Sequence, residues 1–329
     1  MKRLGVIASL SVAALISAPV SPAGSSTSTL SEKHPGDVGM GSDPAVVFYE
    51  DFSEGSVAAV VARYNAVQNS AGMALVPDRP PNSPVSEAMK LTSGGSHAAT
   101  SLYKSLGAGY EELYFRYYIK YIGTGPYHHA GFWIGGYNPP LEYPYPRAGS
   151  RPSGTDLYSI GLEPTGDTHL MDLYTYWMQM RSWKEAPTGA NGDYWGNTLL
   201  QEAGFRLASD SWECYELHLR LNPDPASGAG AVLEVWDNDV LVRRFDETGP
   251  LGFWIRDKFC PKDSTTPACT TYRPANPKLV PLDQRWRATP ALKINYFWAQ
   301  NYNTDRADSS LLLDDMVVAK ERIGCTIKK

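Results

Sequence analysis

The chain has 329 residues, of which 12% are aromatic, including 20 tyrosines and 9 tryptophans. This length fits one large β domain, and the aromatic content supplies a core with rings left over for a surface. The formal net charge of -5 at pH 7 argues against a nucleic-acid-binding protein, which needs a basic footprint. An acidic polysaccharide would need a locally basic groove.

The N-terminus predicts export. Lys2 and Arg3 precede an apolar run over residues 4–16, and small residues at 21–23 offer a cleavage site. This is the pattern of a secretory signal peptide, and the run is shorter than the ~20 apolar residues of a membrane-spanning helix. We expect residues 1–23 to be removed, leaving a secreted or periplasmic monomer with no membrane contact. Residues 24–45, rich in Ser, Thr, Gly and Pro, are expected to form a flexible leader before a single domain over 46–329.

The domain is predicted to be almost entirely β-structure. It begins with a β-branched and aromatic run at Val46, and residues 57–67 have the composition of a helix. Short strand-like segments follow between Pro and Gly clusters, at 87–93, 97–103, 112–122, 130–136, 157–163, 170–180, 213–221, 231–237, 239–245, 291–300 and 310–319. Many short strands with turn-rich joints indicate an antiparallel β-sandwich or jelly roll. The sequence shows no repeat of about 20 to 50 residues, so it does not predict a propeller or a solenoid.

Two of the joints are too long to be simple turns. Residues 138–154 and 181–212 are rich in Trp, Tyr, Arg, Pro and Gly. Long ordered loops usually carry function, so we expect these two to wall a concave groove on one sheet. The alternative is that 181–212 only covers a sheet edge.

The segment from Glu111 to Tyr121 predicts a half-buried strand with an unusual polar face. Period-two alternation places Leu113, Phe115, Tyr117 and Ile119 on one face, and Glu112, Tyr114, Arg116, Tyr118 and Lys120 on the other. Apolar rings suit stacking on a sugar, and fixed cations suit a carboxylate, so the second face is a candidate site for an acidic sugar. The alternative is that its tyrosines merely cover the sheet edge.

Three further segments present chemistry-bearing groups on one strand face each. These faces carry Asp172, Tyr174 and Tyr176; Glu216, His218 and Arg220; and Tyr296, Trp298 and Gln300. In the segment 170–180 both faces carry polar groups, so the pattern does not say which face is buried. A phenol can serve as a general acid or base when neighbouring cations lower its pKa. His129 has the same parity as Gly131, Trp133 and Gly135, and the glycines leave room for a substrate to approach. The alternative for His129 is a satisfied structural residue.

Four cysteines in an exported chain predict disulfides. Cys260 and Cys269 bracket a short irregular segment and are expected to close it, which leaves Cys214 to pair with Cys325. Three pairings are possible, and the sequence alone does not choose among them.

Acidic residues cluster near both ends of the predicted domain. Glu50 and Asp51 lie near its start, and Asp314 and Asp315 near its end. Terminal strands of a sandwich are often neighbours, so Glu50, Asp51 and Asp315 could assemble a structural Ca²⁺ site. Turn caps or solvated strand ends explain these residues equally well.

Motifs of several other enzyme classes are missing from the sequence. Glycosidases need a carboxylate pair at a defined separation, and the run from Glu234 to Asp239 has the wrong spacing. No G-x-S-x-G, HExxH or phosphate-binding loop is present.

Several segments, taken in order, resemble a known family. They are ELYFRYYIKY, LYTYW, DYWGN, WECYELHLRLN, LEVWDNDVLV after a Gly-rich turn, and LLLDDMVVAKERIGC. Over about residues 46 to 326 the chain resembles the concanavalin A-like jelly-roll polysaccharide lyases, in particular the alginate- and glucuronan-lyase-like group and its secreted relatives. It lacks the RTEXR-type, Q-[IV]-H and YxKAGxYxQ strands of the alginate-lyase pattern, so the resemblance does not name the substrate.

The resemblance implies a lyase that cleaves an anionic, uronic-acid-containing polysaccharide by β-elimination and requires no cofactor. By matching strands, Arg116 would neutralise the sugar carboxylate, with Lys120 beside it. Tyr174 or Tyr176 would be the acid or base, and His129 the alternative base. Sugar-binding positions would be Tyr118, Trp133, Arg181, His218, Arg220, Trp298 and Gln300. The alternative function is a non-catalytic, lectin-like carbohydrate-binding protein, because the same fold serves both purposes.

Overall fold

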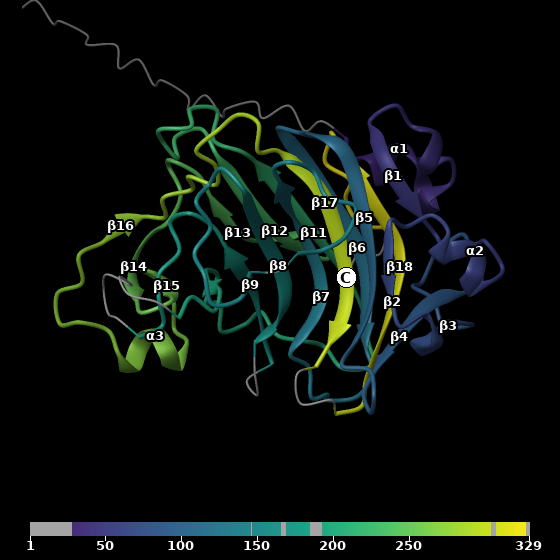
Figure 1. Ribbon diagram of the computed structural model, residues 1–329. Helices are drawn as coiled ribbons and strands as arrows, with labels where there is room; N and C mark the ends of the chain where they lie inside the picture. Colours follow the sequence, from purple (N-terminus) through teal and green to yellow (C-terminus); the bar gives the residue numbers. More distant parts are fainter. Residues whose placement is uncertain (1–27, 146, 166–168, 185–192, 304–306, 327–329) are drawn as a thin grey trace, which may run out of the picture.

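The computed structural model describes residues 28–145, 147–165, 169–184, 193–303 and 307–326. Two large sheets pack face to face as a β-sandwich, as expected from the sequence (Figure 1). The expected signal peptide over residues 1–23 lies outside the described residues. Within the described residues, no helix is long and apolar enough to cross a membrane.

The first sheet has eight strands, and all of its pairings are antiparallel. In spatial order they are β13 (Val240–Phe245), β12 (Val232–Asp237), β11 (Trp212–Arg220), β6 (Glu112–Tyr121), β18 (Ser309–Ala319), β4 (Ala88–Ser93) and β3 (Met73–Val76), with β1 (Val46–Glu50) paired to β18. The first and last strands of the domain are therefore neighbours.

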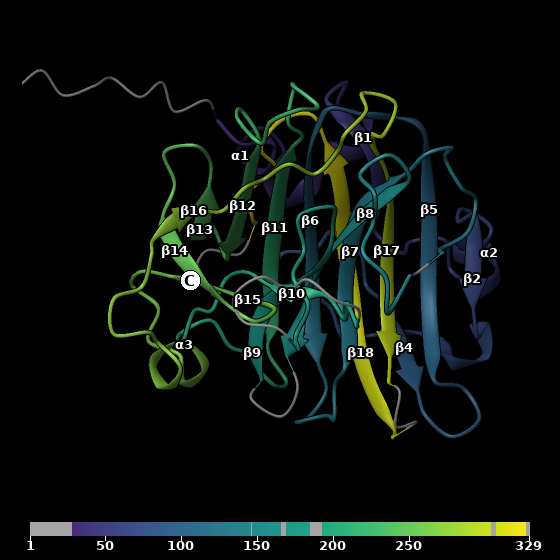
Figure 2. The ribbon, with the colours of Figure 1, turned by 60° about the vertical axis from the view of Figure 1, so that its left-hand side comes forward.

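The second sheet has ten strands, antiparallel except where β10 pairs with β15. In spatial order they are β16 (Val280–Pro281), β14 (Leu251–Ile255), β15 (Lys258–Pro261), β10 (Asn197–Thr198), β9 (Leu170–Tyr176), β8 (Leu157–Thr165), β7 (His129–Tyr137), β17 (Ile294–Tyr302), β5 (Ala99–Tyr110) and β2 (Ala66–Gln68). Figure 2 shows β5, β17, β7, β8 and β9 running side by side.

The described helices are all short. They are α1 (Leu30–Lys33), α2 (Val57–Val61) and α3 (Pro267–Thr271), with 3-10 turns η1 (Pro35–Asp37), η2 (Met40–Ser42) and η3 (Ser70–Gly72). The helix expected over 57–67 is therefore wrong beyond Val61, because residues 66–68 pair with β5 as strand β2.

The core lies between the two sheets and is built from the inward-facing row of each strand. The predicted row Leu113, Phe115, Tyr117 and Ile119 of β6 is fully buried. Tyr117 stacks on Phe132 of the opposite sheet, with ring centroids 4.6 Å apart. Burying a side chain of this size contributes about 1.5–3 kcal/mol, so this row alone holds the two sheets together strongly.

The described part of the expected leader, residues 28–45, packs onto the eight-stranded sheet, so the domain boundary expected at Val46 is wrong. Leu30 and Met40 are fully buried in a cluster with residues of β18 and with Ile323. The amide of Leu30 donates to the carbonyl of Arg322 at 3.0 Å, and Thr29 with Glu32 forms a capping box at α1. Two isolated apolar residues in a Ser- and Gly-rich stretch have no period, so the sequence pattern does not reveal this packing.

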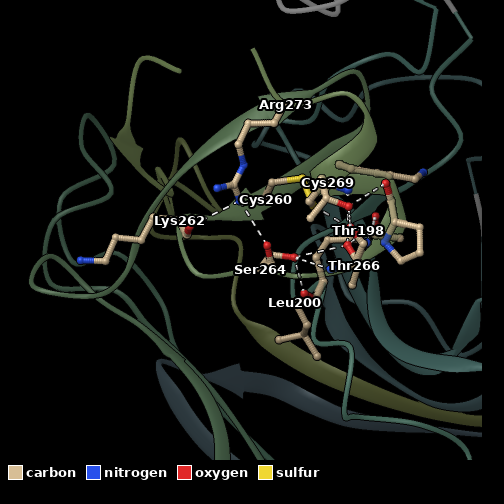
Figure 3. The surroundings of a disulfide bond; sticks show 12 residues. Thr198, Leu200, Cys260, Lys262, Ser264, Thr266, Cys269 and Arg273 are labelled. Carbon is tan, nitrogen blue, oxygen red and sulfur yellow. Dashed lines mark hydrogen bonds between the residues drawn. A yellow bond between two sulfur atoms is a disulfide. The ribbon is translucent and has the colours of Figure 1, made fainter. Parts of the chain in front are cut away.

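Both predicted disulfides form. Cys214 in β11 is bonded to Cys325, which ties the C-terminal segment to the outer face of the eight-stranded sheet. Cys260 in β15 is bonded to Cys269 in α3, which closes the segment between them. Figure 3 shows this second disulfide and the hydroxyl-bearing side chains around it.

Candidate functional site

The outer face of the ten-stranded sheet carries a cavity of about 300 Å³. Its floor is formed by β7, β8, β9 and β17, whose inward rows fill the core and whose outward rows line the cavity. The lining residues are Gln68, Ala99, His129, Trp133, Tyr137, Tyr145, Arg147, Ala148, Leu157, Ser159, Tyr174, Tyr176, Tyr296, Trp298, Gln300 and Tyr302. We call this the central cavity.

Glycines make room for the large rings of the central cavity. Gly161 lies opposite Trp133 and Tyr174 in the β7–β8–β9 register, and a Cβ there would overlap the Trp133 indole. Gly196 has a positive φ of 79°, and a Cβ there would lie 2.5 Å from Cε1 of Tyr174. Larger residues at either position would displace a cavity side chain, so the glycines fix where the rings of Trp133 and Tyr174 lie.

His129 is held by a buried carboxylate. Its Nδ1 lies 2.8 Å from Oε1 of Glu163, which is only 2% exposed, and its ring stacks on Tyr302. Burial opposes a charge on His129, but the carboxylate of Glu163 and the hydrogen bond to it outweigh burial and raise the pKa of His129. The contact fixes the ring orientation and leaves Nε2 as the nitrogen that can serve a substrate.

Two phenols lie next to His129. The hydroxyl groups of Tyr174 and Tyr176 are 3.4 Å apart, and the Tyr174 ring centroid is 4.9 Å from that of His129. Burial raises the pKa of both tyrosines, so both are neutral at physiological pH. A neutral phenol is a proton donor, and these two are placed to deliver a proton inside the cavity.

Arg147 is the one Arg or Lys among the described residues that line the central cavity. Its Nη1 lies 3.0 Å from Oδ2 of Asp156, and its guanidinium lies over the Tyr145 ring. Gln300, on β17, adds an amide that is 3% exposed. Arg147 lies at the Asp156 end of the cavity, and Gln300 pairs with Gly131 nearer to His129, so charge and hydrogen-bond donors are spread along the cavity.

Sequence reasoning missed Arg147, Glu163 and Tyr302. Arg147 comes from the loop 138–154, which was expected to wall a groove, but an irregular loop has no period that points to one residue. Glu163 and Tyr302 continue the outward rows of their strands, and that parity was the available signal for both. The rows predicted from parity for Tyr174 and Tyr176, for Trp298 and Gln300, and for His129 and Trp133 do share this face.

Arg116, Tyr118 and Lys120 do not reach the central cavity, so their predicted place in one groove with Tyr174 is wrong. They lie on the outer face of the opposite sheet. Arg116 is fully buried and pairs with Asp37, its Nη2 2.5 Å from Oδ2. The N-terminal and C-terminal segments cover this face, so the side chains that were predicted to bind a sugar contact other parts of the chain instead. Tyr118 Oη lies 2.7 Å from Oγ1 of Thr326 in the C-terminal segment, and Lys120 Nζ lies 2.8 Å from Oδ2 of Asp78, which follows β3.

Three other predicted binding residues also lie elsewhere. His218 is held between Glu234 and Glu112, at 2.6 and 2.7 Å, on the outer face of the eight-stranded sheet. Arg220, on the same strand, donates from Nε to the carbonyl of Gly230. Arg181 follows β9, and its guanidinium lies over the Trp254 ring at 5.1 Å. These placements remove all three from the central cavity.

Of the three residues predicted to bind calcium, Glu50 and Asp315 are buried where β1 meets β18, and Asp51 follows β1 and is half-buried. Glu50, Asp51 and Glu54 each offer an oxygen within 4.8 Å of the others. Burial raises the pKa of Asp314 to about 9 and that of Asp315 to about 7. One oxygen each of Glu50, Asp314 and Asp315 is buried without a hydrogen-bond partner among the described residues. Carboxylate oxygens are the hard ligands that Ca²⁺ prefers.

No protein-family model matches the sequence, and no curated protein is similar to it in sequence. Among solved structures, a marine alginate lyase from Aplysia kurodai superposes with a TM-score of 0.52 at 13% identity, over 84% of this chain and 99% of that one. The chain therefore shares the jelly-roll β-sandwich fold of that lyase. The alginate lyase Aly36B superposes with a TM-score of 0.48 at 11% identity, over 84% of this chain and 98% of that one.

A protein with a different named activity also superposes on the chain. A carbohydrate esterase from the Shiga toxin-encoding bacteriophage phi24B gives a TM-score of 0.40 at 13% identity, over 84% of this chain and 98% of that one. Identities this low establish nothing about activity, which has to be argued from the site.

Proposed function

We propose that this chain is a secreted polysaccharide lyase that cleaves a uronic-acid-containing polysaccharide by β-elimination. The observation that carries the proposal is the central cavity, which joins a carboxylate-held His129 to two neutral phenols and to the cation of Arg147. Aromatic rings of the same cavity, such as Trp133 and Trp298, offer faces for sugar stacking. Both disulfides support an oxidising, extracytoplasmic location.

The reaction needs three groups, and the central cavity supplies a candidate for each. Gln300, which pairs with Gly131 two residues from His129, would donate to the sugar carboxylate and stabilise the enolate that develops when the neighbouring C5 loses its proton. Arg147, at the Asp156 end of the cavity, would attract the acidic chain. Nε2 of His129 would take that proton while Glu163 stabilises the imidazolium. Tyr174 or Tyr176 would protonate the leaving O4 as the C4–O4 bond breaks and the C4–C5 double bond forms. Proton return from His129 to the tyrosine would restore the site.

We propose in addition that the acidic region at β1 and β18 binds a structural Ca²⁺. Glu50 and Asp51, whose oxygens lie within 4.8 Å of one another and of Glu54, would supply ligands together with Asp315, whose buried oxygen has no hydrogen-bond partner among the described residues. The ion would neutralise buried carboxylates and hold the first strand of the domain to the last, far from the central cavity.

The test is ultraviolet absorbance of the unsaturated product when the purified protein meets alginate, glucuronan or another uronan. Tyr174→Phe removes one hydroxyl from the cavity, and Tyr110→Phe removes one at the far end of β5 as the matched control. If Tyr174 is the proton donor, its loss lowers turnover by about 10²- to 10⁴-fold, while the control keeps wild-type turnover.

Two outcomes would replace the lyase proposal. Binding of uronans without any unsaturated product would identify a carbohydrate-binding protein. New reducing ends without the unsaturated chromophore would identify a hydrolase.

A further inference from the structure

A second cavity, of about 510 Å³, lies at the end of the ten-stranded sheet that carries α3. Its walls come from the turn between β14 and β15, from α3 and its C-cap, and from the segment that follows β9. We call it the hairpin cavity. In Figure 1 the strands β14 to β16 and α3 lie at the opposite side of the molecule from α2.

The hairpin cavity combines exposed rings with cations. Trp183 and Tyr272, two of its lining residues, are 40% and 67% exposed. Arg256, at the turn of the hairpin, is exposed and has no ion-pair partner among the described residues. Lys258 pairs with Asp257, with Nζ 3.2 Å from Oδ1, so the cavity keeps an excess of one positive charge. Stacking faces beside an uncompensated guanidinium suit a sugar ring that carries a carboxylate.

The hairpin cavity lies two strand steps from the central cavity on the same sheet. Tyr174 of β9 pairs with Thr198 of β10, and Thr198 pairs with Lys258 of β15. Neighbouring strands lie about 4.8 Å apart, so two steps across the sheet span about 10 Å, a gap that a few linked sugars can bridge. Burial is the main cause of the raised pKa of Tyr174, and the carboxylate of Asp257 also raises it. Because Asp257 lines the hairpin cavity and Tyr174 lines the central cavity, the two cavities lie within electrostatic range of each other. Figure 2 shows β9, β10 and β15 side by side.

The disulfide holds the hairpin cavity in shape. Cys260 and Cys269 join β15, which carries Lys258, to α3, whose C-cap is Tyr272. The same unit is fastened to β9 through Gln201, whose Oε1 accepts from Thr266 and whose Nε2 donates to Asp172 (Figure 3 shows Thr266). A surface fixed in this way loses little conformational entropy when it binds a ligand.

We propose that the hairpin cavity binds the uronic acid units of a polysaccharide chain that extend past the central cavity. The inference rests on the proposed function for the identity of the ligand. It predicts a preference for long anionic chains, because only a long chain reaches both cavities at once.

The experiment compares the affinity of a uronan polymer with that of a short oligosaccharide of the same sugar, by calorimetry on the Tyr174→Phe background, in which turnover is slowed. Arg256→Ala with Tyr272→Ala tests the hairpin cavity, and Trp183→Ala is a second, independent variant. Lys320→Ala removes one exposed cation just past the end of β18, in the other sheet, and is the control. The polymer should bind the hairpin variants about tenfold more weakly, with the short oligosaccharide unchanged.

The inference is overturned if the hairpin variants bind the polymer as the control does, if polymer and oligosaccharide weaken equally, or if no uronan binds the protein. A separate lyase assay keeps the two proposals apart. Loss of polymer affinity in the hairpin variants, in a protein without lyase activity, would support the hairpin cavity as a binding site and refute the proposed reaction.

Discussion

The substitution Gly196→Ala tests the position of Tyr174 without changing any polar group. A Cβ at residue 196 would lie 2.5 Å from Cε1 of Tyr174, whereas ordinary contacts begin near 3.4 Å, so the ring must move by roughly 1 Å. Misplacing a catalytic group by this amount can cost about 10²-fold in rate. The φ of 79° at residue 196 also strains an alanine, at about 1–2 kcal/mol of stability.

Gly107→Ala separates the two effects. Gly107 has a φ of 70°, and a Cβ at this position would meet nothing within 4 Å, so the variant carries the same backbone strain and displaces no side chain. We expect both variants to lose similar thermal stability and only Gly196→Ala to lose about 10²-fold in kcat on the uronan that the protein cleaves. Equal turnover in the two variants would refute the assignment of Tyr174 as a group whose position matters to the reaction.

Two further predictions concern protons and calcium. If His129 is the base, kcat/KM rises with pH through the raised pKa of His129. Glu163→Gln removes the carboxylate that raises this pKa, so the rise in kcat/KM should move to lower pH. An unchanged pH profile in Glu163→Gln would exclude the His129–Glu163 pair from proton transfer. Calcium should raise the melting temperature and a chelator should lower it, by an amount equivalent to about 2.7 kcal/mol at 100 times the Kd. Protons compete for Asp315, whose pKa is raised to about 7, so the calcium response should fade as the pH drops below that value and should be absent in Asp315→Asn.

The sequence alone predicted the features that depend on the pattern of residues close together in the chain. Alternation with period two is a property of neighbouring residues, so it correctly grouped the residues of β6, β7, β9 and β17 into two rows each, and for β6 it also identified the row that faces the core. The short spacing between Cys260 and Cys269 likewise favoured the pairing that forms, and the second disulfide follows from the first. Alternation therefore grouped the residues of β7, β9 and β17 that line much of the central cavity, and the structure shows that these rows face outward.

Tertiary structure alone decided which outward rows share one face and what covers the others. Arg116 and His129 lie on outward rows of consecutive strands, β6 and β7, but the strands belong to opposite sheets. The face of Arg116 is then covered by residues 28–45 and by the disulfide-bound C-terminal segment, while the face of His129 stays open to the cavity. Strand pairing and segment docking join residues that are distant in the chain, so local alternation predicts neither of them.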